Sequence, residues 1–349
     1  MAHVATITID HTKVAGDLTD YVGLIVPDGS AGYSALYALC LEGGGDIRLF
    51  KSDDTTELAR EIVTFSVSAE TGEIHYKYSG TLSSSVDTAI HVYADGSSTE
   101  PSASATYGSE AVWGDYKFVS HDGGLEESTG NETTSNNGTS TDTTNVAIGA
   151  DARLFNADGD ATNNTLDPRS DIGTGIFSVQ NWSKLTDSTK RANMFWLGAS
   201  TSYHDFVSFF WGNNGGDSDT LRIQFRKGTS GGTTFTETGL KNSDYNSFTT
   251  TRTGNLAKVY VNASLEIDIN NSIVSVNLGD TFRVGSPPFT PDSFRGYQDE
   301  IRLTTTVLAA NYITTEYNNQ NSPSTFYSVA AVAGSSAAQA ARRGAVMMM

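Results

Sequence analysis

Cysteine, proline and basic residues are all scarce in this chain of 349 residues. The single cysteine, Cys40, excludes a disulfide framework within one chain, and its apolar neighbourhood (35–41) predicts a small core residue. Lysine and arginine total 22 against 40 aspartates and glutamates, which gives a net charge of −18. Nucleic-acid binding relies on clustered basic residues, so this composition argues against it. No apolar run is long enough for a membrane-spanning helix, so we expect no membrane insertion.

Sequence motifs of known catalytic sites are also missing. There is no Gly-x-Ser-x-Gly, no phosphate-binding loop and no dinucleotide fingerprint in a βαβ context. The residues closest to a catalytic pattern are Glu266 and Asp268, because jelly-roll β-glucanases carry alternating carboxylates on one strand. Here Asn270 and Asn271 occupy the place of the second catalytic glutamate, so the general acid is lacking. We therefore expect no enzymatic activity, and glycoside hydrolysis is the least favoured alternative.

What the chain has in abundance are residues of strands and turns. It contains 34 glycines, and Thr, Ser, Asn and Asp separate short apolar runs. This pattern predicts an all-β protein. The first part of the chain is expected to form a small β-sandwich with one short helix at 33–41. Its expected strands are 5–9, 21–26, 46–50, 61–67, 73–78 and 88–93. Because residue 3 onward alternates directly as a strand, we expect no secretory signal.

The most informative stretch is 294–303. Gly296 allows a close backbone approach, and Tyr297, Asp299, Ile301 and Leu303 alternate around it as in a strand. A helix is expected over 308–317, ended by Pro323. The strand 294–303, the helix 308–317 and the stretch 316–327 together resemble the closing part of a laminin-G-like (concanavalin A-type) jelly roll of bacteria and phages. The resemblance implies such a jelly roll over residues 109–328.

A second resemblance covers the first part of the chain. The Gly-Gly-Asp-Ile-Arg-Leu-Phe run at 44–50, the Asp-rich turn at 53–58 and the strand 88–93 are similar to a bacterial module of unknown function. That module usually precedes a laminin-G-like domain. The fold we predict is therefore all-β: a small β-sandwich (1–108), a concanavalin A/laminin-G-like jelly roll (109–328) and an Ala-rich C-terminal extension (329–349). The Ser/Thr/Asn-rich run 126–145 is expected to be a surface loop inside the jelly roll.

Three groups of residues are candidates for sites. A mixture of aromatic rings with amides suits sugars, and the candidate ligand-binding residues are Tyr203, His204, Trp211, Asn213 and Asn214. The alternative is that Trp211 belongs to the core and 212–216 to a hairpin turn. Calcium is a candidate cofactor, with oxygen ligands from Asp158, Asp160, Asp217 and Asp219. Zinc is not expected, because the six histidines (His3, His11, His75, His91, His121, His204) show no ligand spacing.

The C-terminal extension is either a floppy tail or an arm that assembles subunits, because a terminal apolar cluster is costly to expose. Its candidate assembly residues are Arg342, Arg343, Met347, Met348 and Met349. The expected function is that of a non-enzymatic virion component, a phage head decoration or tail-fibre appendage, whose jelly roll adheres to cell-surface carbohydrate. Its partners are then other virion subunits or copies of itself. The alternative is a secreted or surface-attached bacterial glycan-binding protein.

Overall fold

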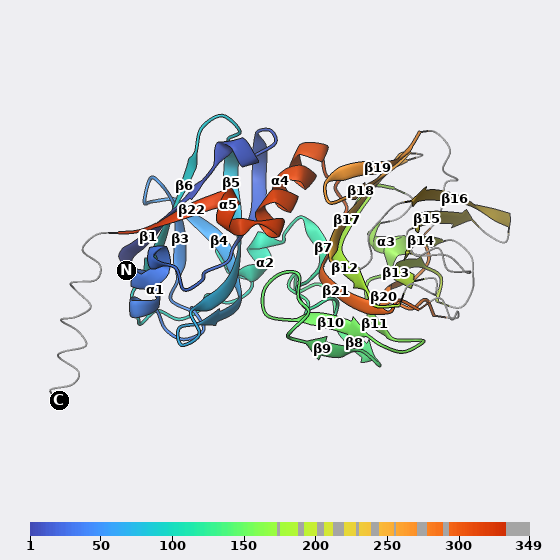
Figure 1. Ribbon diagram of the computed structural model, residues 1–349, viewed down its shortest axis with the longest axis horizontal. Helices are drawn as coiled ribbons and strands as arrows, with labels where there is room; N and C mark the ends of the chain where they lie inside the picture. Colours follow the sequence, from blue (N-terminus) through green and yellow to red (C-terminus); the bar gives the residue numbers. More distant parts are fainter. Residues whose placement is uncertain are drawn as a thin grey trace. The chain divides into compact units, whose positions relative to one another are not determined.

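The computed structural model (Figure 1) describes residues 1–332 except 173–174, 188–191, 201–205, 212–219, 228–229, 239–243, 255, 271–277 and 289–292. Side chains are described for these residues except 206, 208–211, 220, 226–227 and 230–238. Strands dominate, every sheet ladder is antiparallel, and the helices are short. The all-β prediction is confirmed. Among the described residues, no helix has the length and apolarity to cross a membrane.

The chain forms two compact units. Unit 1 consists of residues 1–113 together with 309–349, and unit 2 is the continuous stretch 114–308. This division differs from the sequence-based boundaries, which gave residues 309–328 to the jelly roll. Unit 2 is thus inserted in the sequence of unit 1 rather than following it.

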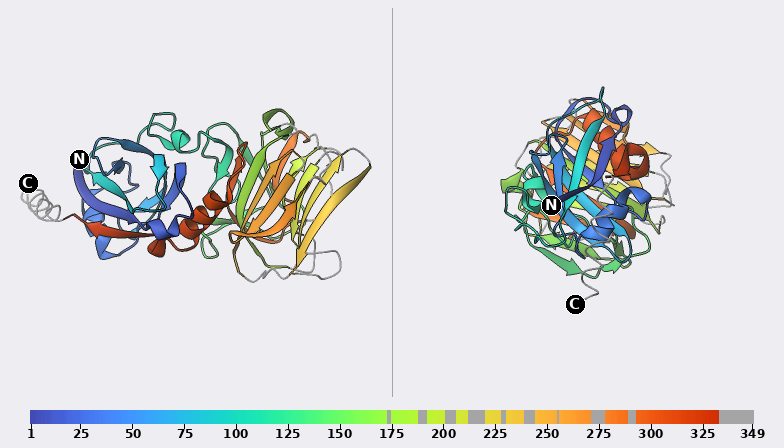
Figure 2. Two further views of the ribbon diagram at one scale, coloured as in Figure 1. Left: turned by 90° about the horizontal axis from the view of Figure 1, so that it is seen from above. Right: turned by 90° about the vertical axis from the view of Figure 1, so that its left-hand side faces the viewer.

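Unit 1 contains one seven-stranded sheet, with the strand order β2-β5-β4-β3-β6-β1-β22. Figure 2 shows the sheet curving around the unit's own apolar core, to which α1 contributes Leu36 and Tyr37. The strands are β1 (Ala2–Ile9), β2 (Leu18–Ile25), β3 (Arg48–Lys51), β4 (Glu57–Ser66), β5 (Thr71–Leu82), β6 (Thr88–Ala94) and β22 (Tyr327–Ala331). The helices are α1 (Ser34–Leu39), α2 (Ser109–Val112), α4 (Ala310–Asn321) and α5 (Pro323–Phe326), with 3-10 turns at His11–Lys13 and Ala31–Tyr33. All six strands and the helix expected before residue 108 are present.

The segment after residue 308 belongs to unit 1 because specific backbone contacts hold it there. The Asn319 side chain accepts a hydrogen bond from the Leu24 amide at 2.7 Å and donates one to the Leu24 carbonyl at 2.9 Å. Strand β22 pairs with β1, with Tyr327 opposite Ile9 and Ala331 opposite Ala5. The prediction that residues from 329 onward belong to neither domain is therefore wrong for 329–331, because these residues complete the edge of the sheet.

Unit 2 consists of two large sheets with an apolar core between them. One has the order β19-β18-β17-β12-β21-β10-β9, with β7 also paired to β21, and the other has the order β16-β15-β14-β13-β20-β11-β8. The strands of the first sheet are β7 (Tyr116–Ser120), β9 (Ser140–Asp142), β10 (Ala152–Phe155), β12 (Phe177–Leu185), β17 (Asn246–Thr253), β18 (Leu256–Val261), β19 (Ser264–Ile269) and β21 (Gly296–Thr304). The strands of the second are β8 (Thr134–Asn137), β11 (Ala161–Asn164), β13 (Ala192–Gly198), β14 (Phe206–Trp211), β15 (Thr220–Lys227), β16 (Ser230–Thr238) and β20 (Thr281–Gly285), and the unit's one named helix is α3 (Pro168–Asp171).

The stretch that stands out in the sequence, 294–303, becomes the interior strand β21. It pairs with β12 on one side and with β10 and β7 on the other. Gly296 has φ +148°, and a Cβ at this position would lie 2.0 Å from the Lys184 carbonyl oxygen. Only glycine fits there, as the sequence suggested. The Ser/Thr/Asn-rich run 126–145 lies inside unit 2 and contributes the strands β8 and β9.

Candidate functional site

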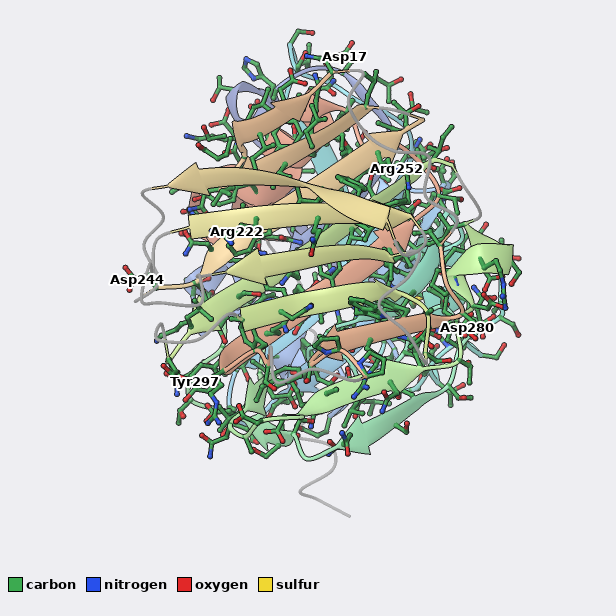
Figure 3. All side chains as sticks on the ribbon, turned by 90° about the vertical axis from the view of Figure 1, so that its right-hand side faces the viewer. Asp17, Arg222, Asp244, Arg252, Asp280 and Tyr297 are labelled. Atoms are coloured by element: carbon green, nitrogen blue, oxygen red, sulfur yellow. The ribbon has the colours of Figure 1, made fainter. Side chains whose placement is uncertain are left out.

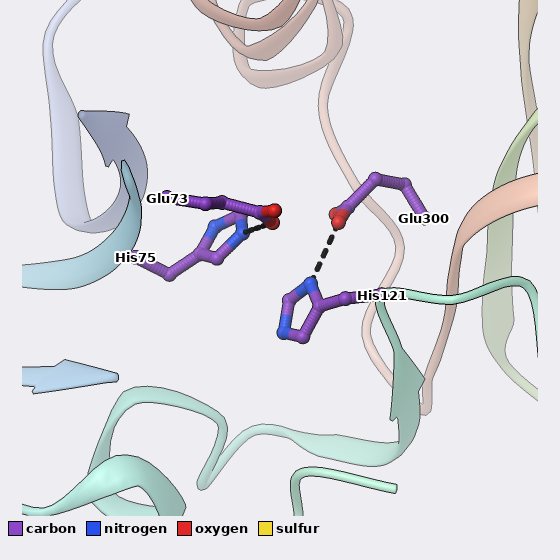
Figure 4. A group of neighbouring side chains, drawn as sticks. All are labelled: Glu73, His75, His121 and Glu300. Atoms are coloured by element: carbon purple, nitrogen blue, oxygen red, sulfur yellow. Dashed lines mark hydrogen bonds and ion pairs between the residues drawn. The ribbon is translucent and has the colours of Figure 1, made fainter. Parts of the chain in front are cut away.

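The charged residues of β21 are buried and are hydrogen-bonded to side chains and backbone amides of unit 2. Glu300 has φ +51° at a bulge of the strand, a conformation that few residues other than glycine adopt. Its Oε1 lies 2.6 Å from His121 Nδ1 (Figure 4), and its Oε2 accepts a hydrogen bond from Arg302 Nε at 3.1 Å. Paired buried charges of this kind are expected in a structural network.

Two neighbouring carboxylates, those of Asp299 and Asp122, also accept hydrogen bonds, here from backbone amides. Asp299 Oδ2 accepts hydrogen bonds from the amides of Ala147 and Ile148, at 2.9 and 3.0 Å. Asp122 forms an ion pair with Arg153, and its Oδ1 accepts from the amide of Leu125 at 2.8 Å. These bonds fix the loops beside β21. The charged residues Asp299, Glu300 and Arg302 of β21 therefore have a structural explanation and by themselves indicate no active site.

Unit 1 has its own buried pair of a histidine and a carboxylate on β5. His75 Nε2 lies 2.9 Å from Glu73 Oε1 (Figure 4), and the His75 ring packs 5.3 Å from the ring of Trp113. The pair was not singled out from the sequence. The sequence signal that could have identified it is the two-residue spacing of Glu73 and His75, which places both side chains on one face of a strand.

Most of the predicted site residues lie outside the described residues. This holds for Tyr203, His204, Asn213, Asn214, Asp217 and Asp219, and for Arg342, Arg343, Met347, Met348 and Met349. Trp211 is the last residue of β14, but its side chain is not described.

The other two predicted calcium ligands are placed. Asp158 is exposed and lies 2.9 Å from the guanidinium of Arg295. Asp160 is buried, and its Oδ2 accepts hydrogen bonds from the amides of Asn156 and Ala157, each at 2.7 Å. Both carboxylates thus have protein partners in this structure, and among the described residues neither belongs to a cluster with metal-ligand geometry.

The carboxylates that resemble a glucanase motif lie on the edge strand β19. Ile267 and Ile269 enter the core, whereas Asp268 is exposed and lies 3.9 Å from Lys258 on β18. Glu266 is half-buried on the same side of the strand as Asp268.

The outer face of the seven-stranded sheet in unit 2 is the most promising surface for a ligand (Figure 3). Trp196 alternates with the core residues Phe195 and Leu197 on β13, so it lies on the side of the sheet away from the core. The strand register places Arg283 directly opposite Trp196, and Asn163 directly opposite Arg283. In the other direction the same row continues through residue 208 to Gln224 on β15.

Two arginine side chains, Arg222 and Arg283, place positive charge on this face. Arg222 stands two residues before Gln224 on β15 and is labelled on the central part of the sheet in Figure 3. Arg222 and Arg283 are half-buried, and the Nε atom of each is buried without a hydrogen-bond partner among the described residues. Burial lowers the pKa of Arg283. We define the outer face by Asn163, Trp196, Arg222, Gln224 and Arg283.

Unit 1 contains a cavity of about 360 Å³. Its lining includes the aromatic rings of Tyr33 and Tyr327, but both tyrosines are buried, and the Tyr327 hydroxyl accepts a hydrogen bond from the Val26 amide at 2.8 Å. The rings are therefore part of the core of the unit and offer little surface to a ligand.

No protein family and no curated protein matches this sequence. Solved structures are similar to it at low identity. Domain 4 of AbnA, an extracellular arabinanase of Geobacillus stearothermophilus in complex with arabinotriose, is 18% identical, with a TM-score of 0.43 over 57% of this chain and 97% of that one. The receptor-binding domain of botulinum neurotoxin D is 14% identical, with a TM-score of 0.46 over 59% of this chain and 53% of that one.

A botulinum neurotoxin type C structure, whose cell entry depends on interaction with two ganglioside molecules, is also 14% identical, with a TM-score of 0.47. The match covers 60% of this chain and 52% of the toxin chain. This chain therefore spans about half the length of the toxin chains to which it is similar. These likenesses are in β architecture.

Proposed function

We propose that this chain is a non-enzymatic adhesion protein and that the outer face of unit 2 binds an acidic carbohydrate. The observation that carries this proposal is the pair of guanidinium groups of Arg222 and Arg283 on one sheet face of a chain whose net charge is −18. Each has a buried Nε without a hydrogen-bond partner among the described residues. A guanidinium binds a carboxylate with two parallel hydrogen bonds, so the half-buried guanidinium groups of Arg222 and Arg283 suit an acidic sugar.

The remaining side chains of the outer face suit the neutral part of a carbohydrate. Asn163 and Gln224 offer amides that both donate to and accept from sugar hydroxyls. The row from Arg283 to Gln224 crosses three interstrand spacings, or about 14 Å at ~4.8 Å each. A surface of this length fits an oligosaccharide better than a single ring. Trp196 lies in the same row but is fully buried, so it supports the neighbouring side chains and offers no surface of its own to a ligand.

The absence of catalysis is part of the proposal. Asp268 faces Lys258 on the surface, and the next position on that face of the strand is Asn270 rather than a glutamate. A retaining glycosidase needs two carboxyl groups across the scissile bond, one of which donates a proton. The position of Glu266 and Asp268 on the edge strand β19 supports their interpretation as ordinary surface residues.

The setting that we propose is a phage particle, in which the chain is a head or tail appendage and contacts other virion subunits or copies of itself. Support comes from the resemblance of 294–303, which forms β21 of unit 2, to the closing strand of jelly rolls from bacteria and phages. A secreted or surface-attached bacterial glycan-binding protein is the second candidate. Both candidates require the same carbohydrate-binding face.

Binding of the full chain to immobilised acidic and neutral oligosaccharides tests the proposal. We expect saturable binding to oligosaccharides that carry carboxylates and a loss of at least about 10-fold in affinity for Arg222→Ala or Arg283→Ala, because each removes a charge-assisted hydrogen bond. The matched control is Arg169→Ala, an arginine of unit 2 whose side chain is 62% exposed and lies 3.4 Å from Asp167. Equal binding of the neutral oligosaccharides, or an unchanged affinity in both variants, would contradict the proposal.

A further inference from the structure

Two histidines that are 88 residues apart in the sequence meet on the sheet of unit 1. His3 lies on β1 and His91 on β6, and their rings are 4.2 Å apart between centroids with an interplanar angle of 30°. The third member is Asp54, in the turn between β3 and β4. Each of the three side chains offers one ligand atom, and these atoms all lie within 4.8 Å of one another.

A β-bulge makes this meeting geometrically feasible. His3 stands opposite Tyr93, Ala5 stands opposite Val92, and the register shifts between His3 and Ala5. Val4 is thus an extra residue in β1, and its side chain is fully buried in the core. Without the bulge, regular alternation from the core residue Ala5 would place His3 on the core side, away from His91.

We propose that His3, His91 and Asp54 bind a divalent transition-metal ion, with zinc as the expected occupant. Two imidazoles and one carboxylate form a donor set that zinc accepts, with a fourth position left to water or a ligand. His3 and His91 are partly exposed and Asp54 is exposed, so an ion reaches the cluster from solvent.

The present distances need only a small adjustment for metal binding. His91 Nδ1 lies 2.5 Å from Asp54 Oδ1, a contact that holds a proton in this structure. Two ligands at about 2.0–2.1 Å from a tetrahedral zinc are separated by about 3.4 Å, so these atoms must separate by less than ~1 Å while the ion replaces the proton. Rotation of the exposed Asp54 side chain is enough for this change.

Neighbouring groups hold the ligands in place, as in known metal sites. The Tyr93 hydroxyl donates a hydrogen bond to Asp54 Oδ1 at 2.8 Å. His3 Nε2 lies 3.0 Å from the Ala5 carbonyl, which can only accept a hydrogen bond, so Nε2 carries the proton and Nδ1 keeps its lone pair.

The test is metal titration of the full-length chain after treatment with a chelator. We expect one Zn²⁺ per chain by calorimetry, and a Co²⁺ complex with visible absorption that Zn²⁺ displaces. His3→Ala, His91→Ala and Asp54→Asn should each weaken Zn²⁺ binding by at least about 100-fold, because losing a ligand costs more than losing its support. NMR of the unaltered chain gives a readout that does not depend on variants: Co²⁺ should broaden the imidazole signals of His3 and His91 first.

The matched control is the partly exposed cluster of Asp10, His11 and Asp87, which contains only one histidine. His11→Ala should leave Zn²⁺ binding unchanged. The proposal is overturned if the full chain shows no saturable Zn²⁺ binding, if His11→Ala removes it while His91→Ala does not, or if Co²⁺ broadens other histidine signals first. Failure of this test leaves the carbohydrate site untouched, because the two sites belong to different units.

Discussion

The two units differ in how much of the chain each needs. Unit 2 is continuous, and its ends meet: Tyr116 near its start pairs with Thr304 near its end, and the Thr304 hydroxyl donates a hydrogen bond to the Asp115 carbonyl at 2.6 Å. Unit 1 is assembled from two segments separated by the whole of unit 2. A domain whose ends lie together can be inserted in another without breaking it, and unit 2 has this property.

Unit 1, in contrast, depends on residues from both ends of the chain. The strand β22 and the Asn319 side chain satisfy backbone groups of β1 and β2 that come some 300 residues earlier in the chain. Phe326 and Tyr327 are buried in the same core as Val4 and Ile7. Residues 1–113 alone would therefore expose an open sheet edge and part of the core.

The largest effect that we predict comes from a chain that ends at residue 308. It should lose the unfolding transition of unit 1 and keep that of unit 2, because only unit 1 depends on α4, α5 and β22. Hydrogen exchange measured by mass spectrometry should show unprotected β1 and β2 beside protected β12 and β21. A chain that ends at residue 332 is the control and should protect all four strands. Protected β1 and β2 in the shorter chain would show that unit 1 needs only its first segment.

The units also differ in how they treat a buried arginine. Arg60 in unit 1 and Arg252 in unit 2 are each fully buried. Arg60 donates to the Ile47 carbonyl at 2.5 Å, to the Gly45 carbonyl at 3.1 Å and to Glu100 at 2.7 Å. Arg252 donates only through Nε, to the Gly254 carbonyl at 3.3 Å, and its two terminal nitrogens have no partner among the described residues. We therefore expect these two equally buried arginines to affect stability in opposite directions.

Arg60→Met should destabilise unit 1 by about 3–5 kcal/mol, since it leaves buried carbonyls and a carboxylate without their donor. Urea unfolding, followed by hydrogen exchange in β3 and β4, measures the loss. The exposed arginine variant Arg169→Met should change stability by no more than about 0.5 kcal/mol. A loss below about 1 kcal/mol for Arg60→Met would mean that water replaces these hydrogen bonds at little cost.

Alternation in the sequence was sufficient to predict the strands before residue 108, because it depends only on which face of a strand is apolar. It missed β8 and β9, which lie in the Ser/Thr/Asn-rich run 126–145 and carry no apolar alternation. It could not predict the nested arrangement, because no pattern within 309–331 tells which sheet those residues complete. The outer face of unit 2 shows the same limit. The alternation of Arg222 and Gln224 with core residues is visible in the sequence, but their alignment with Arg283 depends on the pairing of four strands. His3 and His91 meet only because of one bulge.

Arg252→Met is expected to have the smallest effect, of opposite sign to that of Arg60→Met. The Arg252 side chain points into the core beside Phe177 and Ala257, and its guanidinium lies 5.5 Å from the centre of the Phe225 ring. Burial lowers the pKa of Arg252 to about 10, so the folded state disfavours the cation at every pH below that value, and the penalty declines only as the pH rises above 10 toward the higher pKa of the unfolded chain.

At pH 7 the penalty for the Arg252 cation is fully present, and methionine removes it while filling a similar volume. The contact with the Phe225 ring offsets only part of it, because cation–π contacts contribute about 0.5–2 kcal/mol. We therefore expect Arg252→Met to stabilise unit 2 by about 1–3 kcal/mol in urea unfolding at pH 7, with hydrogen exchange slowed in β17. Destabilisation of similar size would show that the guanidinium has a partner in the folded protein that outweighs its burial.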